Sequence, residues 1–161
     1  MIRIGIISDT HNKLPSEVFS LFRQVNHIFH AGDIGNLSIL NQLSSIAPVH
    51  AVYGNTDVYP PGSTLPSRLA IRLDNIHFMM QHDIGSISSF YRKIRGNEVE
   101  IIPDVVIFGH THEPLIKKHQ NIFFMNPGSA VSPRGAPYGT VILLETSDGL
   151  LVRSDIVQLQ E

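Results

Sequence analysis

Hydrophobic residues in the first third of the chain form short continuous runs, separated by segments with helical spacing. The continuous runs cover residues 2–7, 27–30 and 49–53, the length of a buried β-strand. Between them, apolar side chains recur every three to four residues, which predicts two amphipathic helices. These side chains are Val18, Leu21, Phe22 and Val25, then Ile39, Leu40, Leu43 and Ile46. The order β-α-β-α-β with short connections predicts parallel strands joined by right-handed crossovers.

The rest of the chain has more closely spaced strand patterns. Paired apolar runs around Asp74-Asn75 and around Gln120-Asn121 predict two hairpins. Residues 86–97 predict a short amphipathic helix that stops at Gly96-Asn97. The hairpin strands are expected at 68–73, 76–80, 115–118 and 122–125, further strands at 105–108, 140–145 and 150–158, and turns at 59–63 and 126–129.

Residues that commonly bind metals follow these strands at the point where each strand ends. The first are Asp9 and His11, and extended backbone would turn both side chains to the same side. The later ones are Asp33, Asn55, His82, His110 and His112. Because parallel strands present their carboxyl ends at one edge of a sheet, we expect all seven side chains to converge there.

The donor types in this set indicate a borderline divalent cation. Two carboxylates, one carboxamide and four imidazoles suit Mn²⁺, Fe²⁺, Co²⁺, Ni²⁺ or Zn²⁺, and contain too much nitrogen for Ca²⁺ or a typical Mg²⁺ site. Seven donors are too many for one ion with an open position, but they fit two ions if one carboxylate bridges. Gly32, Gly54 and Gly109 each precede a donor, where the missing Cβ would permit positive φ and close approach to the ions.

Composition limits the other function classes. The 161 residues suffice for a single domain, residues 1–161, and the absence of cysteine excludes disulfides and thiolate metal sites. A net charge of −2 gives no reason to expect nucleic acid or an acidic membrane as a partner. No apolar run approaches the ~20 residues that span a bilayer, and no signal-peptide pattern opens the chain, so a cytoplasmic location is expected.

The ordered motifs D-x-H, GD, GN, a lone His and GHTH resemble those of the calcineurin-like metallophosphoesterase superfamily. They stand here at residues 9–11, 32–33, 54–55, 82 and 109–112. The short chain, the opening IISDTH and the NPGS turn are similar to its small bacterial and archaeal phosphodiesterase branch, and the resemblance covers nearly the whole chain. It implies an α/β fold of four layers (α/β/β/α), a two-sheet β-sandwich flanked by helices on both outer faces.

The resemblance also implies a dinuclear site with the donors divided between two ions. One ion would bind Asp9, His11 and His112, and the other Asn55, His82 and His110, with Asp33 bridging. The ions, most simply two Mn²⁺, would lower the pKa of a bridging water and polarise a phosphate oxygen, and the resulting hydroxide would attack phosphorus in line.

The expected catalytic residues are therefore Asp33, Asn55 and His82. Asn55 would also bind the substrate, while Arg134 either holds a substrate phosphate or is a solvated loop cation. The expected activity is that of a metal-dependent phosphodiesterase, acting on a small phosphodiester or phosphomonoester. The resemblance also implies a homo-dimer or homo-tetramer, because small members of the family often form them. The alternatives are a non-catalytic scaffold on the same fold, as in the retromer subunit that resembles this family, and a nuclease.

Two departures from the family pattern bear on the chemistry. Many members have a histidine where this chain has Thr56, and threonine cannot act as a general acid near neutral pH. Close relatives commonly read T-H-G-H where this chain has Gln81-His82-Asp83-Ile84. Asp83 would either perturb the second ion or take part in proton transfer, which makes His82 the least secure of the seven ligands.

Other polar residues are expected to support structure. Asp57 is expected to orient backbone or a ligand histidine. His30 is expected to be a packed strand residue, with support of the nearby Asp33 as the alternative. Ser129 has no base paired with it by motif, so it is not expected to be a nucleophile, and Asn126 and Gly128 are expected to shape a turn beneath the site. The remaining histidines are expected to be exposed or locally hydrogen-bonded, namely His27, His50, His77 and His119.

Overall fold

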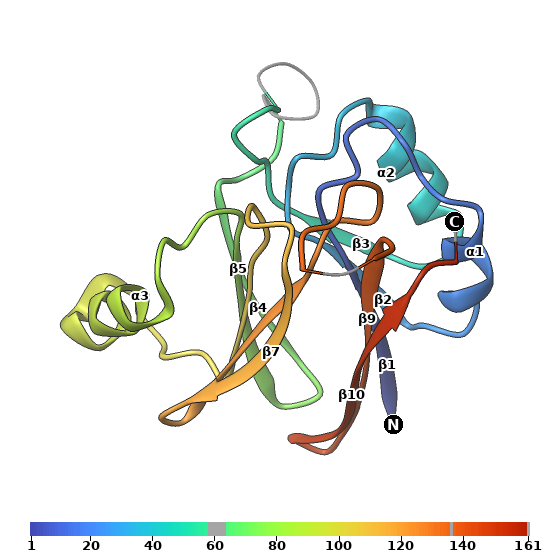
Figure 1. Cartoon of the computed structure of the whole chain (residues 1–161). Coiled ribbons are helices and arrows are strands. Elements are labelled where there is room, and N and C mark those ends of the chain that lie inside the picture. Colours follow the sequence, from blue (N-terminus) through green and yellow to red (C-terminus); the bar gives the residue numbers. More distant parts are fainter. Residues whose placement is uncertain (58–63, 136, 161) are drawn as a thin grey trace.

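Two five-stranded β-sheets face each other in the computed structural model of this chain, which describes residues 1–57, 64–135 and 137–160 (Figure 1). The first sheet has the order β10-β9-β1-β2-β3 and the second β4-β5-β6-β8-β7. The strands of the first sheet are β1 (Ile2–Ile7), β2 (His27–His30), β3 (Val49–Ala51), β9 (Thr140–Ser147) and β10 (Leu150–Gln158). Those of the second are β4 (Arg68–Leu73), β5 (Ile76–Gln81), β6 (Val105–Ile107), β7 (Pro114–His119) and β8 (Ile122–Pro127).

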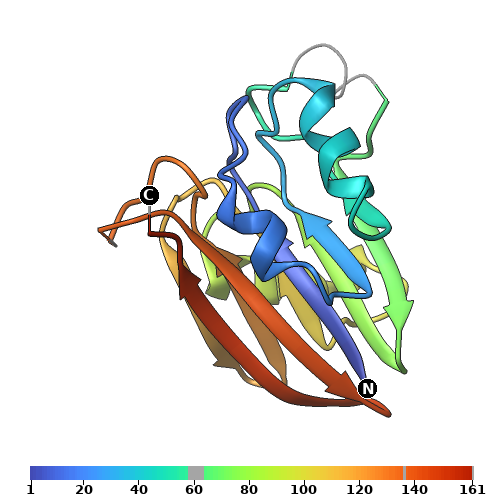
Figure 2. The same cartoon turned by 90° about the vertical axis from the view of Figure 1, so that its right-hand side faces the viewer.

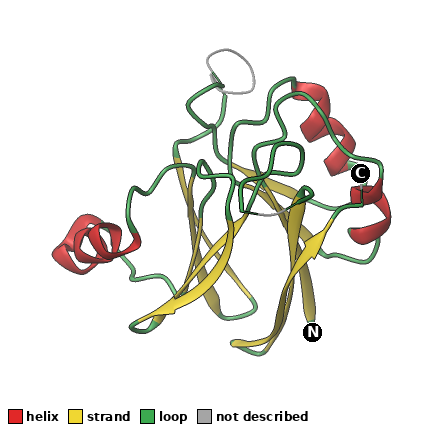
Figure 3. Cartoon of the chain, in the orientation of Figure 1, coloured by secondary structure: helices red, strands yellow, loops and turns green. Residues whose placement is uncertain are grey.

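Each sheet contains three adjacent parallel strands, which end at the β3 edge of the first sheet and lie at the centre of the second. The parallel pairs are β1 with β2 and β2 with β3 in the first sheet, and β5 with β6 and β6 with β8 in the second. Loops that leave the carboxyl ends of these strands gather at one end of the molecule, opposite the hairpin turns (Figure 3). The donors were expected at the edge of one sheet, but the loops of the candidate site come from both sheets.

Alternating side chains on the central strands build separate cores on the two faces of each sheet. Ile4 and Ile6 of β1 pack between the sheets against Phe78 and Ile107. On the opposite face of β1, a Cβ at Gly5 would lie 2.8 Å from the ring of Phe22. Glycine at this position therefore lets the segment after β1 pack tightly against the strand that leads to Asp9.

Helices cover both outer faces. The helices α1 (Glu17–Leu21) and α2 (Leu37–Ser44) lie over the first sheet (Figure 2). The helix α3 (Ile87–Lys93) continues as a π-helical segment, Ile94–Glu98, and packs on the second sheet through Phe90 and Ile94. The four-layer α/β/β/α class is thus confirmed. Among the described residues, no helix is long and apolar enough to cross a membrane.

Several element boundaries differ from the expected ones. The first helix ends at Leu21, before Val25, because the chain turns back so that the Asn26 N–H can donate to the Arg3 carbonyl. Gly96-Asn97 lies inside the π-helical segment and does not end the helix, and β3 stops at Ala51. Asn126-Pro127 belongs to β8, where Pro127 still pairs with Pro114. The turn expected at 59–63 lies outside the described residues.

Candidate metal centre

The side chain of Asp9 lies at the centre of the predicted ligand set and is fully buried. Its Oδ2 accepts hydrogen bonds from the Ser8 hydroxyl at 2.6 Å and from the His110 N–H at 3.2 Å. Its Oδ1 has no hydrogen-bond partner among the described residues. Buried polar atoms without a partner are rare in native proteins, so Oδ1 marks a position where a ligand is expected.

His112 faces this unpartnered oxygen. Its Nδ1 lies 2.7 Å from the Ser132 carbonyl oxygen, which can only accept, so Nδ1 carries the hydrogen. In the neutral ring, Nε2 then has only a lone pair, and it lies 3.2 Å from Asp9 Oδ1. His11 Nε2, 3.8 Å from the same oxygen, is likewise buried without a partner in the described part of the chain. Asp9, His11 and His112 thus form a group whose ligand atoms lie within 4.8 Å of one another.

A second group consists of Asp9, Asp33 and His82, all buried and within the same 4.8 Å limit. The His82 Nδ1 donates to the Ala31 carbonyl at 2.8 Å, which again directs the Nε2 lone pair of the neutral ring into the site. This Nε2 lies 3.3 Å from Asp33 Oδ2 and 3.0 Å from Asn55 Oδ1. Three acceptor atoms therefore converge on one point.

The charges at this point favour a positive species. Burial disfavours the charged carboxylate of Asp33, but the protonated form of His82 and the Thr56 N–H both donate to it, outweigh the effect of burial and hold its pKa below the usual range. For His82, burial lowers the pKa, while the Asp33 and Asp9 carboxylates raise it by more, so the net shift is upward. A proton or a cation between His82 and Asp33 is thus stabilised by the same oxygens.

The last two predicted ligands join the second group from its exposed side. Asn55 Oδ1 lies 3.2 Å from His110 Nδ1 as well as 3.0 Å from His82 Nε2. Contacts therefore link all seven predicted donors. Asp9 belongs to both groups, and Asp33 also faces both, since its Oδ2 lies 3.9 Å from His11 Nε2. Both carboxylates therefore face both groups, and bridging by Asp33 stays a prediction.

The backbone of the ligand loops is left-handed at five of the seven donors, not extended. The residues with φ between 43° and 73° are Asp9, His11, Asp33, His110 and His112. The expectation that extended backbone aligns Asp9 with His11 is wrong. Such φ values cost free energy in non-glycine residues and cluster at functional sites, where surrounding contacts maintain them.

The glycines before the donors serve mainly for close approach. Gly32 has the expected positive φ of 105°, whereas Gly54 and Gly109 are not among the described residues with positive φ. A Cβ on Gly54 would collide with Asp33 Oδ1, and one on Gly109 with the Ser8 hydroxyl. The expected φ is therefore wrong for these two, but the need for a missing side chain is real.

Buried hydrogen bonds outside the donor set hold the ligand loops. Asp57 accepts from the backbone N–H groups of Ile34, Gly35 and Gly54, which ties the Asp33 loop to the Asn55 loop. Ser129 donates its hydroxyl hydrogen to the Asp9 carbonyl. Asn126 donates to the Gly109 carbonyl and thereby supports the loop of His110 and His112.

His30 supports the ligand loops, the less favoured of the two roles expected from the sequence. The fully buried ring accepts from the Gly32 N–H at 3.1 Å and therefore donates through Nε2 to the Thr10 hydroxyl at 3.0 Å. Thr10 in turn donates to the Ile34 carbonyl. The His-Ala-Gly-Asp order after a strand was the available signal, but it does not show that the ring turns back on the loop.

The residues that depart from the family pattern lie around the second group. Thr56 is exposed, and its N–H bonds to Asp33. Ile84 is buried in the apolar core beneath α3. Asp83 is exposed, with Oδ2 3.6 Å from His110 Nε2. Arg134 donates its backbone N–H to the His112 carbonyl and has an exposed side chain, so it lies beside the site without a fixed role.

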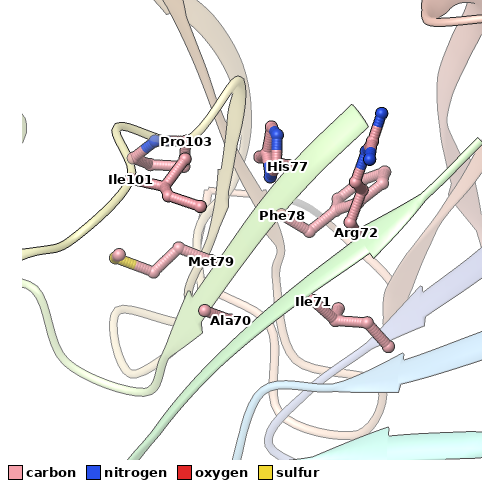
Figure 4. Close-up of a pocket in the computed structure, with 8 residues that line it drawn as sticks. All are labelled: Ala70, Ile71, Arg72, His77, Phe78, Met79, Ile101 and Pro103. Atoms are coloured by element: carbon pink, nitrogen blue, oxygen red, sulfur yellow. The ribbon is translucent and has the colours of Figure 1, made fainter. Parts of the chain in front are cut away.

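A separate pocket of about 360 Å³ lies along β4 and β5 and the segment before β6 (Figure 4). Its lining is largely apolar, with Arg72 and His77 as the polar exceptions. None of the seven predicted donors lines it, so it is not the candidate site. His27 and His50 also lie outside the site, with Nδ1 and Nε2 3.1 Å apart, and burial lowers the pKa of both rings.

Comparison with known proteins gives the same family as the motifs. Residues 2–149 match the family model of the calcineurin-like phosphoesterase superfamily domain. A probable metallophosphoesterase of Methanothermobacter thermautotrophicus is 34% identical over 160 residues, covering 96% of this chain and 91% of that protein. A phosphodiesterase of Methanocaldococcus jannaschii is 27% identical over 144 residues, covering 79% of this chain and 83% of its own.

A solved structure with the same fold is that of Vps29 from Entamoeba histolytica complexed with zinc. It superimposes with a TM-score of 0.77 at 21% identity and covers 98% of both chains. Identity at this level shows the shared fold alone.

Proposed function

The chain belongs to the calcineurin-like phosphoesterase superfamily, and we propose that it is a dinuclear metal-dependent phosphodiesterase. The observation that carries the proposal is the orientation of two imidazoles. His82 and His112 each donate Nδ1–H to a backbone carbonyl and direct Nε2 at a buried carboxylate. In the neutral rings these are acceptors facing acceptors, which repel unless a proton or a metal cation lies between them.

The proposed division of donors is the one that the family resemblance implies, and its first set coincides with the group Asp9, His11 and His112. One ion would be held by Asp9, His11 and His112, and the other by Asn55, His82 and His110, with Asp33 between them. Mixed imidazole and oxygen ligands favour Mn²⁺, with Fe²⁺, Co²⁺, Ni²⁺ and Zn²⁺ as alternatives. Support comes from the two buried atoms without hydrogen-bond partners, Asp9 Oδ1 and His11 Nε2, because both are potential ligand atoms.

When bound, two divalent ions supply a nucleophile at neutral pH by lowering the pKa of water, and they polarise a phosphoryl oxygen. The protein's own residues would orient the reactants. Asn55 is exposed and contacts both His82 and His110, so its carboxamide is available to a phosphate oxygen at the mouth of the site. Thr56 cannot donate a proton near neutral pH, so substrates with good leaving groups would react fastest.

A phosphodiester is the substrate class that we favour, because the relative from M. jannaschii is named a phosphodiesterase. The competing proposal is a non-catalytic scaffold on the same fold. All seven donor positions are filled and linked by contacts, whereas a scaffold has no need for buried carboxylates aligned with imidazole lone pairs.

The proposal is tested by hydrolysis of bis-p-nitrophenyl phosphate after removal of metals and addition of Mn²⁺, with p-nitrophenyl phosphate as the monoester comparison. We expect metal-dependent hydrolysis of the diester and its loss in Asp33→Asn. The exposed Glu113→Gln serves as a control for charge near the site. Absence of hydrolysis with every divalent ion tested, or full activity in Asp33→Asn, would refute it, and a metal content near zero would favour the scaffold.

A further inference from the structure

We propose that Asp83 is a positioning residue for His110, and that this chain uses it to strengthen the second metal site; the inference rests on the proposed function. His110 has one ring nitrogen on each side of the site boundary. Its Nδ1 lies 3.2 Å from Asn55 Oδ1, inside the ligand cluster, and its Nε2 lies 3.6 Å from Asp83 Oδ2, outside it.

This orientation determines which nitrogen of the His110 ring carries the hydrogen when a metal ion is bound. If Nδ1 binds a cation with its lone pair, the neutral ring must carry its hydrogen on Nε2, which points at the Asp83 carboxylate. A carboxylate on the far nitrogen of a ligand histidine fixes the ring orientation and increases the basicity of the metal-binding nitrogen. The present 3.6 Å exceeds hydrogen-bond length, and we expect it to shorten when an ion binds.

Asp83 is held in place by contacts that leave Oδ2 free for this contact. Its Oδ1 accepts from the Gly85 N–H at 3.0 Å. Its carbonyl accepts from the Gln81 side-chain amide at 2.8 Å, and Gln81 accepts from Arg68 at the same distance. The Gly109 N–H also donates to the His82 carbonyl at 2.9 Å, which joins the loops of the two histidines.

His110 needs such a partner more than the other ligand histidines do. His82 and His112 donate their second nitrogen to backbone carbonyls, at 2.8 and 2.7 Å. His110 is exposed, and the Asp83 carboxylate is the acceptor that the described residues place against its second nitrogen. The aspartate in place of the family's glycine thus supplies what the fold gives the other two rings through the main chain.

The test is a titration of the metal-free chain with Co²⁺, followed by calorimetry and by visible absorption of the bound ion. Asp83→Asn keeps an oxygen for the Gly85 N–H but removes the charge that faces His110, and Asp83→Ala removes both. Glu113→Gln, next to His112 and exposed, removes an equal charge without contacting His110. The melting temperature in EDTA reports any purely structural effect.

We expect two Co²⁺ sites in the unmodified chain and in Glu113→Gln. In both Asp83 variants the affinity of one site should fall by about 10- to 100-fold, with the other site and the metal-free melting temperature unchanged. In a His110→Ala background, Asp83→Asn should cause no further loss, because the coupled partner is gone.

Unchanged affinities in Asp83→Asn, or an equal loss in Glu113→Gln, would overturn the inference while leaving two ions per chain and the proposed function intact. Failure of the unmodified chain to bind Co²⁺ would overturn the proposed function and this inference with it.

Discussion

His112 and Asp9 face each other across 3.2 Å, Nε2 to Oδ1, with the other nitrogen of His112 already donating to a main-chain carbonyl. In the metal-free protein with a neutral ring, two hydrogen-bond acceptors therefore face each other with no hydrogen between them. The carboxylate is fully buried, and Oδ1 has no hydrogen-bond partner in the described part of the chain. Such a pair destabilises the protein until a positive charge lies between its members.

The first prediction concerns Asp9→Asn. The amide NH₂ of the variant can donate to the His112 lone pair, and its oxygen can still accept from Ser8 and the His110 N–H. We expect the metal-free variant to melt above the metal-free unmodified chain, by roughly 2–4 °C for each kcal/mol of relieved repulsion. Calorimetric melting in EDTA measures this.

Manganese should reverse this order of stability. At a hundred times its Kd, Mn²⁺ should stabilise the unmodified chain by about 2.7 kcal/mol per site. Asp9→Asn should gain little, because Asp9 belongs to both ligand groups. An Asp9→Asn protein that melts lower in EDTA, or that gains as much from Mn²⁺, would contradict the account.

The second prediction is acid destabilisation through His30. Burial lowers the pKa of this ring to about 3, from an ordinary value near 6.5, with the charge of His82 as a smaller cause. Above pH 6.5 the ring is neutral in both the folded and the unfolded chain. Between pH 6.5 and 3 only the unfolded chain takes up the proton. The free energy of unfolding therefore decreases as the pH is lowered, by at most about 1.4 kcal/mol per pH unit.

Urea unfolding of the metal-free protein between pH 6.5 and 4.5 measures this slope. The lowered pKa values of His27 and His50 also reduce the stability as the pH falls below 6.5. The raised pKa of His82 changes the stability only above pH 6.5, and the lowered pKa of Asp33 only below about pH 4. His30→Gln should therefore flatten the slope more than the partly buried control His50→Gln. Equal slopes in His30→Gln and the unmodified chain would count against a neutral, buried His30.

The third prediction is that Thr56→His accelerates substrates with poor leaving groups. Position 56 is exposed, and the substitution keeps the hydrogen bond from the backbone N–H to Asp33 but loses the one from the Thr56 hydroxyl. A positioned general acid contributes about 10²–10⁴-fold, so a rise in kcat of about tenfold or more is expected for an alkyl diester. A p-nitrophenyl diester should gain little, and Thr56→Ala should match the unmodified chain for both. Equal gains for the two diesters would rule out proton donation.

The sequence predicted the fold class and the meeting of the seven candidate donors because both depend on repeated local signals. Strand length, helical spacing and polar residues at strand ends placed the seven donors at loops that do meet. The two-sheet arrangement was predicted from the resemblance to the family, because periodicity alone does not reveal how strands are divided between sheets. The matched family model confirms the resemblance.

The sequence could not predict features that depend on tertiary contacts. The left-handed backbone at Asp9 and His11 is maintained by bonds to the Gly32 and Asp33 carbonyls, which come from the neighbouring strand's loop. The contact between Asp83 and His110 joins residues on two different strand ends. Spacing along the chain carries no information about either.

The most direct test of the central claim is a crystal structure of the Mn²⁺-loaded protein with anomalous diffraction measured at the manganese edge. We expect two peaks about 3.5–4 Å apart, one beside Asp9, His11 and His112 and the other beside Asn55, His82 and His110. Asp33 should lie between them. A single peak, or manganese bound away from these side chains, would contradict the dinuclear assignment.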